Sequence, residues 1–276
     1  MEASRESVEV VETELLLEAV YRVYGHDFRG YAPATLRRRV LHTVQVEGLP
    51  SVSALQHQVL HEPQALGRLL GALSIPVTEM FRDPSFYRAL REQVLPVLRT
   101  HPFLRVWHAG CATGEEVYSL AMVLEEEGLL ERTRLYATDL SAAALEAARA
   151  GLYPQEKLDA YAQSYREAGG RADFAAYFDR HGGHGRVMER LRRPVIWGQH
   201  NLVSGGSFNE FHLILCRNVL IYFSKPLQEQ VQELLLGSLM PFGVLALGRH
   251  ESLDFSPHAG RFSALNPAEK LYRRVS

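Results

Sequence analysis

A glycine turn between an apolar strand and a helix constrains the fold of this chain more than any other feature. Residues 104–108 predict a short strand, and Gly110 and Gly114 lie in the turn that follows. Residues 115–127 then predict a helix, and residues 134–138 predict a second strand. Strand, glycine turn, helix and strand in this order are typical of a parallel α/β sheet.

Later segments continue this alternation. The predicted elements are a helix over 142–150 capped by Ser141, strands over 195–199, 212–216 and 244–247, a helix over 226–239, and a closing hairpin near Phe262 and Leu271. Residues 155–195 contain two Gly-Gly pairs and do not fit the alternation. They predict a small insertion at the edge of the sheet.

The first 75 residues predict a different, all-helical unit. Apolar residues at helical spacing predict helices over 13–24, 34–47, 53–60 and 63–73, after a frayed tail over 1–10. In the first helix we expect four residues to face inward: Leu16, Ala19, Val20 and Val23. Asp83-Pro84 predicts the N-cap and first turn of a helix near the start of the second unit. The predicted domains are therefore a helical domain over 1–75 and an α/β domain over 76–276.

Composition excludes several classes of protein. With 276 residues, 46% of them apolar, the chain is long enough for one large or two modest domains. A net charge of −2 argues against a nucleic-acid partner. Two cysteines cannot form a disulfide scaffold, and without an H-E-x-x-H or paired-cysteine motif no metal is expected. The N-terminus lacks a secretory leader, and no apolar run approaches the roughly 20 residues of a membrane helix, so we expect a cytoplasmic protein without membrane insertion.

The glycine turn and Asp139 together form a candidate nucleoside site. Gly110 and Gly114 let the backbone approach a ligand, and Asp139 ends the second strand, where an acid can bind a ribose diol. The turn lacks the G-x-G-x-x-G spacing of a pyrophosphate site, and Glu115-Glu116 follow it directly. Carboxylates there favour a cationic nucleoside, which points to S-adenosylmethionine. A tight turn without a ligand is the alternative.

Two further segments bring polar residues to the same region. Arg217, Asn218 and Tyr222 follow the strand over 212–216, where ligands of open parallel sheets bind. Arg82 lies at the join between the two units, and an arginine can hold a carboxylate through two hydrogen bonds. Alone, each segment is better explained by a salt-bridged arginine or a packed tyrosine. The first segment lacks the prolines of an Asn-Pro-Pro-Tyr-like loop, which argues against a base or amide nitrogen as the group that is modified.

Together, these segments resemble the chemotaxis receptor methyltransferases of the CheR type. The matching text is T-x-x-F-R over 78–82, V-W-x-A-G-C-x-T-G-E-E-x-Y-S over 106–119, A-T-D over 137–139, N-L over 201–202 and C-R-N-V-x-I-Y-F over 216–223. Order and spacing match over most of the chain, while the helical unit and the insertion match in layout more than in residues. The resemblance implies a Rossmann-like α/β domain that uses S-adenosylmethionine, an N-terminal all-helical domain and a small β insertion.

The resemblance also implies a function and a set of site residues. The activity is that of a protein-glutamate O-methyltransferase acting on a chemoreceptor or receptor-like signalling protein, with S-adenosylhomocysteine as a product. The expected cofactor-binding residues are Thr78, Arg82, Ala109, Gly110, Glu116, Asp139, Asn201, Leu202, Cys216 and Arg217. Arg82 and Tyr222 are the expected catalytic residues, nearest the transferred methyl. The residues expected to face the acidic methylation helices of the receptor are Arg37, Arg38 and Arg39. The insertion corresponds to a small β-subdomain that grips a receptor tail in some members.

Two departures from the family pattern stand out. Pro76 occupies a position where many members have asparagine, and proline offers neither a carboxamide nor an N–H to a cofactor. Residues 248–251 read Gly-Arg-His-Glu where members often have a Gly-His-Ser-Glu-like run. Two alternatives stay open: a cofactor-binding signalling scaffold without turnover, and a methyltransferase for another acceptor, such as RNA or a small carboxylic acid.

Overall fold

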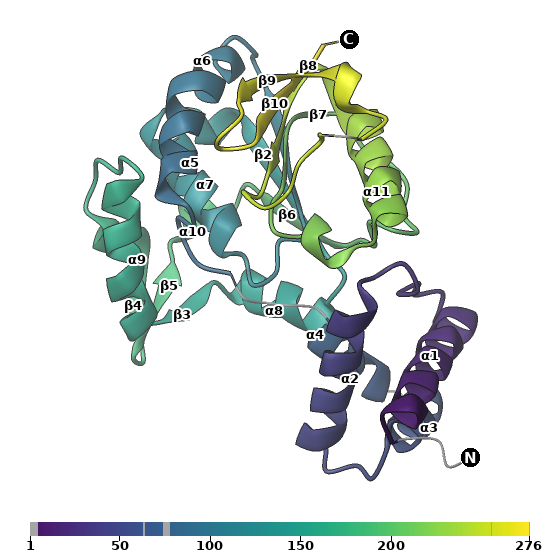
Figure 1. Cartoon of the computed structure of the whole chain (residues 1–276). Helices are drawn as coiled ribbons and strands as arrows, with labels where there is room; N and C mark the ends of the chain where they lie inside the picture. The colour runs from purple at the N-terminus through teal and green to yellow at the C-terminus, as the bar shows by residue number, and fades with distance from the viewer. Residues whose placement is uncertain (1–4, 63, 74–77, 255, 276) are drawn as a thin grey trace.

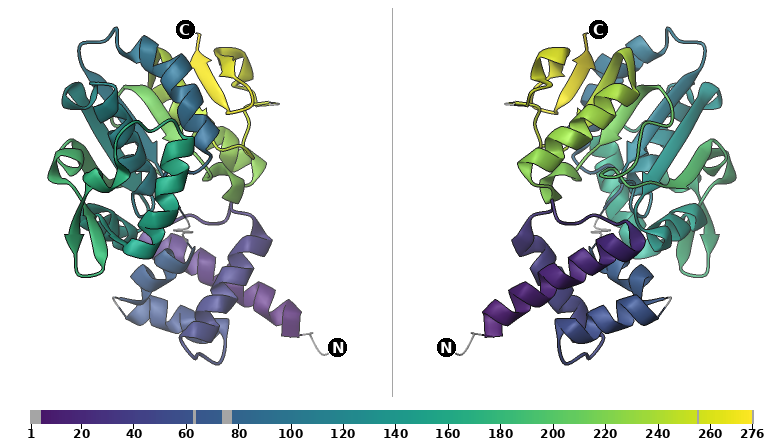
Figure 2. Two further views of the ribbon diagram at one scale, coloured as in Figure 1. Left: turned by 90° about the vertical axis from the view of Figure 1, so that its left-hand side faces the viewer. Right: turned by 90° about the vertical axis from the view of Figure 1, so that its right-hand side faces the viewer.

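The computed structural model describes residues 5–62, 64–73, 78–254 and 256–275. It consists of an N-terminal helical part and a larger α/β part (Figure 1). Figure 2 shows the helical part packed against one end of the α/β part. The predicted boundary at 75/76 and Pro76 lie outside the described residues, so the division of the chain at that point stays a prediction. No described helix is both long and apolar enough to cross a membrane.

The helical part has its own core. Its described helices are α1 (Arg5–Tyr24), α2 (Pro33–Val46), α3 (Val52–His61) and α4 (Ala65–Leu73). Buried residues from all four helices pack together, among them Leu16, Leu36, Leu55 and Leu69. The Ser51 side chain caps α3 by accepting a hydrogen bond from Ala54 N–H (3.2 Å). Helices α2, α3 and α4 lie where the sequence predicts them.

Helix α1 ends at Tyr24, as predicted, but it differs from its prediction in where it begins and in which residue of its last turn faces inward. It begins at Arg5, so the frayed tail predicted over 1–10 is wrong from that residue onward. The first valines of α1 are exposed, and a helix without a buried face leaves no periodic signal. Val23 was expected to face inward but is 59% exposed. Tyr24 takes the inward side of this last turn, where its hydroxyl donates to Val59 O (2.8 Å).

A seven-stranded sheet forms the centre of the α/β part. The strands are β1 (Leu104–Ala109), β2 (Thr133–Asp139), β6 (Val195–Gln199), β7 (Phe211–Cys216), β8 (Leu239–Leu247), β9 (Phe262–Asn266) and β10 (Leu271–Arg274). Their order is β6-β2-β1-β7-β8-β10-β9. The first five in this order run parallel, while β10 and β9 pair antiparallel. The predicted parallel sheet and closing hairpin are confirmed.

Helices cover both faces of this sheet. In β7, Leu213 and Leu215 pack into one core and Ile214 and Cys216 into the other, as the alternation of a strand requires. Helix α11 (Lys225–Ser238) covers the second core. The first core is covered by α7 (Glu115–Glu126) and by α5 (Pro84–Ala89), which continues through a π-helical turn (Leu90–Val94) into α6 (Leu95–Leu98). Helix α8 (Ala142–Ala150) is capped by Ser141, as predicted.

The insertion forms a small separate sheet. Its strands are β3 (Leu152–Pro154), β5 (His184–Val187) and β4 (Phe178–His181), in the order β3-β5-β4. Helices α9 (Gln155–Glu167) and α10 (Glu189–Arg192) accompany it (Figure 1). The insertion predicted from about residue 155 is present, and it begins slightly earlier, at Leu152. Short 3-10 turns lie at Leu130–Arg132, Phe174–Tyr177, Leu220–Tyr222 and Ala259–Arg261.

A short segment of the helical part also pairs with the α/β part. Between α1 and α2, residues 30–32 run beside residues 222–224. Ser224 N–H donates to Gly30 O (2.7 Å), and Ala32 N–H donates to Tyr222 O (3.0 Å). Tyr31 and Phe223 form an antiparallel bridge between these two bonds. We call residues 30–32 the strap, because they tie the helical part to the α/β part.

Candidate functional site

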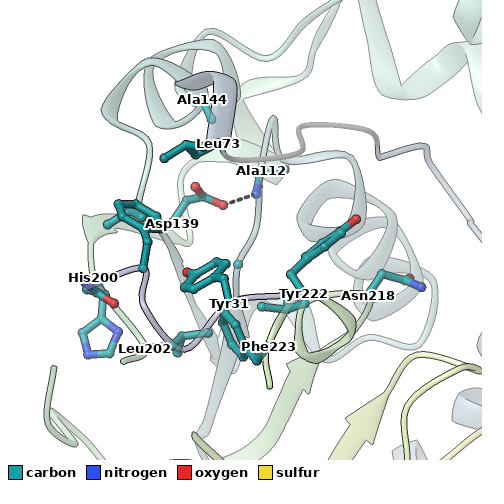
Figure 3. Close-up of a pocket in the computed structure, with 15 residues that line it drawn as sticks. Tyr31, Leu73, Ala112, Asp139, Ala144, His200, Leu202, Asn218, Tyr222 and Phe223 are labelled. Carbon is teal, nitrogen blue, oxygen red and sulfur yellow. Dashed lines mark hydrogen bonds between the residues drawn. The ribbon is translucent and has the colours of Figure 1, made fainter. Parts of the chain in front are cut away.

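A cleft opens at the carboxyl ends of β1, β2 and β7, next to the helical part (Figure 3). It has two adjoining halves. One half is lined by Asp139, Leu140, Asn201 and Leu202, and the other by Thr78, Glu79, Arg82, Glu116 and Arg217. The residues shared by both halves are Gly110, Ala112, Asn218 and Tyr222. The edge of a parallel sheet at which strands end is where ligands of such folds bind.

The glycine turn forms the floor of the cleft. Gly110 has φ +80°, and a Cβ atom there would lie 2.6 Å from Val219 Cγ2. The N–H groups of Gly110 and Cys111 both donate to Thr138 O (2.8 and 2.9 Å), which ties the turn to β2. Gly114, with φ +88°, precedes the first turn of α7. The turn therefore needs glycine for its conformation and for its close approach to the loop after β7.

Asp139 ties the turn after β1 to the segment that starts α8. Its Oδ2 accepts a hydrogen bond from Ala112 N–H (2.8 Å), and its Oδ1 accepts one from Ser141 N–H (2.9 Å). Burial raises the pKa of Asp139, and these backbone bonds counteract part of that rise. Each carboxylate oxygen keeps a further lone pair. A rigid acceptor that faces the cleft can thus bind two neighbouring hydroxyl groups.

A buried cluster of charges closes the other half. Glu116 Oε1 lies 3.1 Å from His108 Nδ1, and Glu116 Oε2 accepts from Arg217 Nη1 at 3.0 Å. Arg217 Nη2 donates to Asp83 Oδ2 (2.7 Å), and the guanidinium lies 4.0 Å above the Phe86 ring. Burial alone raises the pKa of Glu116, but the His108 bond and the Arg217 charge outweigh it and lower the pKa. Glu116 therefore stays an ionised carboxylate at the cleft.

This cluster corrects two expectations. Asp83 does not cap α5 with its side chain: its backbone is left-handed (φ 57°), and its carboxylate binds Arg217 instead. Glu115 does not face the cleft beside Glu116. It is 2% exposed, and its carboxylate accepts a hydrogen bond from the Thr113 hydroxyl (2.6 Å). One carboxylate of this pair, not two, is available to a ligand.

The Glu251 carboxylate holds the loop after β7 through hydrogen bonds to the loop's backbone. The Glu251 carboxylate accepts hydrogen bonds from the N–H groups of Asn218 (2.9 Å), Val219 (2.7 Å) and Leu220 (2.7 Å). Asn218 has φ +60°, so these bonds stabilise a conformation that asparagine tolerates better than most residues. This role accounts for a glutamate at the end of the 248–251 run. The neighbouring Arg249 reaches Glu269 (3.1 Å) at the surface.

The structure brings most of the predicted site residues together. Those that line the cleft are Thr78, Arg82, Gly110, Glu116, Asp139, Asn201, Leu202, Arg217 and Tyr222. Ala109 and Cys216 are the last residues of β1 and β7, and their buried side chains do not line it. Arg37 lines a separate hollow between α1 and α2, and Arg38 is exposed. Arg39 donates to Ala72 O (3.0 Å). The roles assigned to all these residues stay predictions.

The sequence did not predict that residues of the helical part form one wall of the cleft. Phe28, Tyr31 and Leu73 line the half of the cleft that contains Asp139, which we call the nucleoside half. Leu73 lies beside Ala144 there (Figure 3). A signal for two of them exists in the sequence. Phe28 and Tyr31 are large aromatic residues in a loop between helices, and such residues need a surface to pack on.

The residues present fit a nucleoside that carries a positive charge. One half offers the Asp139 acceptor and the apolar Leu202 side chain, and the other offers the ionised Glu116. The crowded Gly110 turn leaves no side chain between them. In the part of the chain that the structure describes, no group of three or more His, Cys, Asp or Glu residues is placed to hold a metal ion.

Known proteins match both parts of the chain. Residues 76–268 match the family described as "CheR methyltransferase, SAM binding domain", and residues 12–74 match "CheR methyltransferase, all-alpha domain". The chain is 46% identical over 264 residues to a Pseudomonas putida protein named as methyltransferase Cher3, covering 96% of this chain and 97% of that protein. It is 29% identical to a chemotaxis protein methyltransferase of Listeria monocytogenes, with 91% and 89% covered. It is also 29% identical to chemotaxis protein methyltransferase 2 of Pseudomonas aeruginosa, with 88% and 87% covered.

Proposed function

Because the chain belongs to the CheR methyltransferase family, whose cofactor is S-adenosylmethionine, we propose that it methylates glutamate side chains of a chemoreceptor or receptor-like signalling protein. The products are the glutamyl methyl ester and S-adenosylhomocysteine. Relatives named as chemotaxis protein methyltransferases support a chemoreceptor as the acceptor. The observation that carries the glutamate assignment is that Arg82 and Tyr222 line the same half of the cleft.

The two halves of the cleft suit the two ends of the cofactor. Asp139 would accept the ribose hydroxyls, with Asn201 and Leu202 beside the nucleoside. Glu116, with Thr78 and Arg82 near it, would face the charged amino-acid end. Any contact from Ala109 and Cys216 has to come from their backbone atoms, because their side chains are buried away from the cleft.

Tyr222 lines both halves and so marks a place where cofactor and acceptor can meet. Burial raises the pKa of Tyr222, and the positive charges of Arg39 and Arg82 act against that rise. The phenol therefore keeps its proton at pH 7 and can donate a hydrogen bond. The two arginines favour an anion beside it. A glutamate carboxylate meets both conditions, whereas a neutral amine or base can accept the hydrogen bond but carries no negative charge.

A carboxylate acceptor also needs no general base to remove a proton before methyl transfer. With a reference pKa of about 4.3, a glutamate is already ionised at pH 7. The bound sulfonium supplies an activated methyl group. Arg82 and the Tyr222 hydroxyl orient one carboxylate oxygen, and orientation of this kind is worth about 7–11 kcal/mol. Too tight a grip would stabilise the carboxylate before transfer, so we expect both residues to position the acceptor and not to bind it strongly.

Acceptor docking is assigned to α2. Arg38 is exposed and Arg37 half-buried on this helix, so both are accessible to an acidic helix of the receptor. Arg39 lies closer to the cleft, where its charge acts on Tyr222. One helix would thus connect the docking surface with the acceptor carboxylate.

The acceptor is tested by following labelled methyl groups. Purified protein is incubated with methyl-labelled S-adenosylmethionine and the cytoplasmic fragments of chemoreceptors from its host. We expect label on the receptor that mild alkali releases as methanol, as a carboxyl ester requires. Alkali-stable label, or label on RNA instead, would show that the acceptor is a different one. Normal binding of S-adenosylhomocysteine without any transfer would favour the scaffold alternative.

The roles of Tyr222 and Arg82 are tested in the same assay. We expect Tyr222→Phe to lower turnover about tenfold and to leave the Kd for S-adenosylhomocysteine within about twofold, because the hydroxyl positions the acceptor. Arg82→Ala should lower both turnover and cofactor affinity. Tyr21→Phe, on the exposed side of α1, is the control and should behave as the wild type. Full turnover by the Arg82→Ala/Tyr222→Phe double variant would exclude both roles.

A further inference from the structure

We propose that Tyr31, in the strap of the helical part, is a cofactor-binding residue. Its ring walls the nucleoside half of the cleft, and its hydroxyl hydrogen-bonds to the nucleoside beside Asp139. The proposal rests on the cofactor site described above. It adds a residue from outside the α/β part and makes the helical part a component of cofactor binding as well as of acceptor docking.

The strap fixes the backbone of Tyr31 at the cleft. The hydrogen bonds of Gly30 O and Ala32 N–H to the 222–224 segment lie on either side of it. Gly30 also lies against α11, where a Cβ atom would come within 2.9 Å of Leu227 Cδ2 and 3.3 Å of Leu227 Cβ. A glycine thus lets the strap approach the α/β part closely enough for the next side chain to enter the cleft.

Aromatic contacts fix the ring of Tyr31. Its centroid lies 5.1 Å from that of Phe28, with the planes at 58°, and 4.7 Å from that of Phe223, with the planes at 78°. Figure 3 shows the ring in the cleft with its hydroxyl on the side of Asp139. Tilted and edge-on contacts of this kind favour one ring position. The side chain is therefore in place before a ligand enters.

The hydroxyl of Tyr31 is available to a ligand. No hydrogen bond joins it to another residue in the described ranges, and it is not among the buried polar atoms that lack a partner. Burial raises the pKa of Tyr31, and the negative charges of Asp139 and Asp27 raise it further, so the phenol keeps its proton. A donor and a carboxylate acceptor thus face the same space.

This pairing selects a class of ligand. A hydroxyl group can donate to a carboxylate and accept from a phenol at the same time. A sugar diol placed between Asp139 and Tyr31 satisfies both side chains. The ribose of a nucleoside cofactor carries such a diol, whereas an unsubstituted base does not.

Calorimetric titration of the full chain with S-adenosylhomocysteine tests the proposal. We expect Tyr31→Phe to raise the Kd three- to tenfold, the effect of one lost hydrogen bond. Its melting temperature without ligand should stay at the wild-type value, because the hydroxyl bonds to none of the residues that the structure describes. Tyr24→Phe is the matched control: it removes a hydroxyl of the same part that bonds to Val59 O. It should lower the melting temperature and leave the Kd unchanged.

Combining Tyr31→Phe with Asp139→Asn tests whether the Tyr31 hydroxyl bonds to the same diol as Asp139. If Tyr31 and Asp139 hold the same diol, the effects of Tyr31→Phe and Asp139→Asn on the Kd should combine to less than their product. A wild-type Kd in Tyr31→Phe would overturn the role of Tyr31 and leave the remaining cofactor site intact. No binding by the wild-type chain would instead overturn the cofactor site, and the role of Tyr31 with it.

Discussion

Among single residues, Arg217 shows how this protein uses buried charge. Its side chain is 2% exposed and is held by Glu116 and Asp83. A buried ion pair adds little net stability, because taking both charges out of water offsets their attraction. The role of Arg217 here is geometric, because its ion pairs hold Glu116 at the cleft and join the start of α5 to the loop after β7. Loss of either carboxylate leaves a guanidinium without its full set of partners.

Glu116→Gln should make the free energy of unfolding depend less on pH below about pH 5. Burial raises the pKa of Glu116, but His108 and Arg217 outweigh it and hold the pKa below its ordinary value of 4.5. The unfolded chain therefore takes up a proton at this residue before the folded protein does. The wild type loses this part of its stability as the pH falls from about 5 through the lowered pKa, whereas the variant has no such loss.

Urea unfolding at pH 7, 5 and 4 measures this difference. We expect Glu116→Gln to be less stable than the wild type at pH 7 and to lose less stability below pH 5. Glu146→Gln is the control, because Glu146 is 72% exposed on α8, and it should keep the wild-type slope. A wild-type slope in Glu116→Gln would show that Glu116 is not held ionised.

Among elements, the turn after β1 gives a test of why glycine is needed. Gly110 and Gly128 both have a left-handed backbone, with φ +80° and +67°. A Cβ atom at Gly110 would meet Val219 Cγ2 at 2.6 Å, whereas nothing lies within 4 Å of one at Gly128. Backbone strain alone should cost Gly128→Ala about 1 kcal/mol. Strain and overpacking together should cost Gly110→Ala about 2–4 kcal/mol.

A second substitution should relieve the clash that Gly110→Ala creates. Val219→Ala removes the atom that the new Cβ would meet, so Gly110→Ala/Val219→Ala should recover part of the loss caused by Gly110→Ala alone. Chemical unfolding of the four variants gives these differences. Equal losses for Gly110→Ala and Gly128→Ala would mean that φ, and not the close approach, requires the glycine.

The elements that could be predicted are those with local signals. The strand over 195–199 was predicted with both its ends, and the Ser141 cap marks the start of α8. Asp83 has the same local signal as a cap, yet a distant arginine takes its carboxylate. The π-helical turn Leu90–Val94 precedes Pro96, which has no N–H for the carbonyl four residues back. Leu95 N–H then bonds to Leu90 O, five residues back, which the sequence did not predict.

At the scale of the whole molecule, the cofactor should stabilise both parts together. S-adenosylhomocysteine at 100 times its Kd should add about 2.7 kcal/mol to the free energy of unfolding. For a chain of this size that is a rise of about 5 °C in Tm. Both tryptophans, Trp107 and Trp197, lie in the α/β part, so their fluorescence follows that part, while circular dichroism follows the helices of both.

We expect both signals to shift by the same amount. Asp139→Ala should abolish the shift, because it removes the acceptor for the ribose. A shift in fluorescence with no shift in circular dichroism would show that the ligand stabilises the α/β part alone. An unchanged shift in Asp139→Ala would place the ligand elsewhere.

The site could be predicted as far as it lies in contiguous motifs. The turn at 109–114, Asp139 and the segment 216–223 each follow a strand, and the strands of a parallel sheet end at one edge. Tyr31 lies in another part of the chain, and its place depends on how the two parts pack. Glu251 was missed for a similar reason, because four of its backbone partners come from a loop about 30 residues earlier.

The strap has a consequence for protein engineering. Under the docking role proposed for α2, exchanging helical domains between relatives should direct the enzyme to a new receptor, and the sequence predicts a junction near residue 75. The contacts of the strap favour a different junction. Residues 28–32 belong with the recipient, because they pack on Phe223 and α11, while α2 can come from the donor with its docking surface. A chimera joined after residue 32 would keep its own Phe28 and Tyr31 at the cofactor and take the proposed docking helix from the donor.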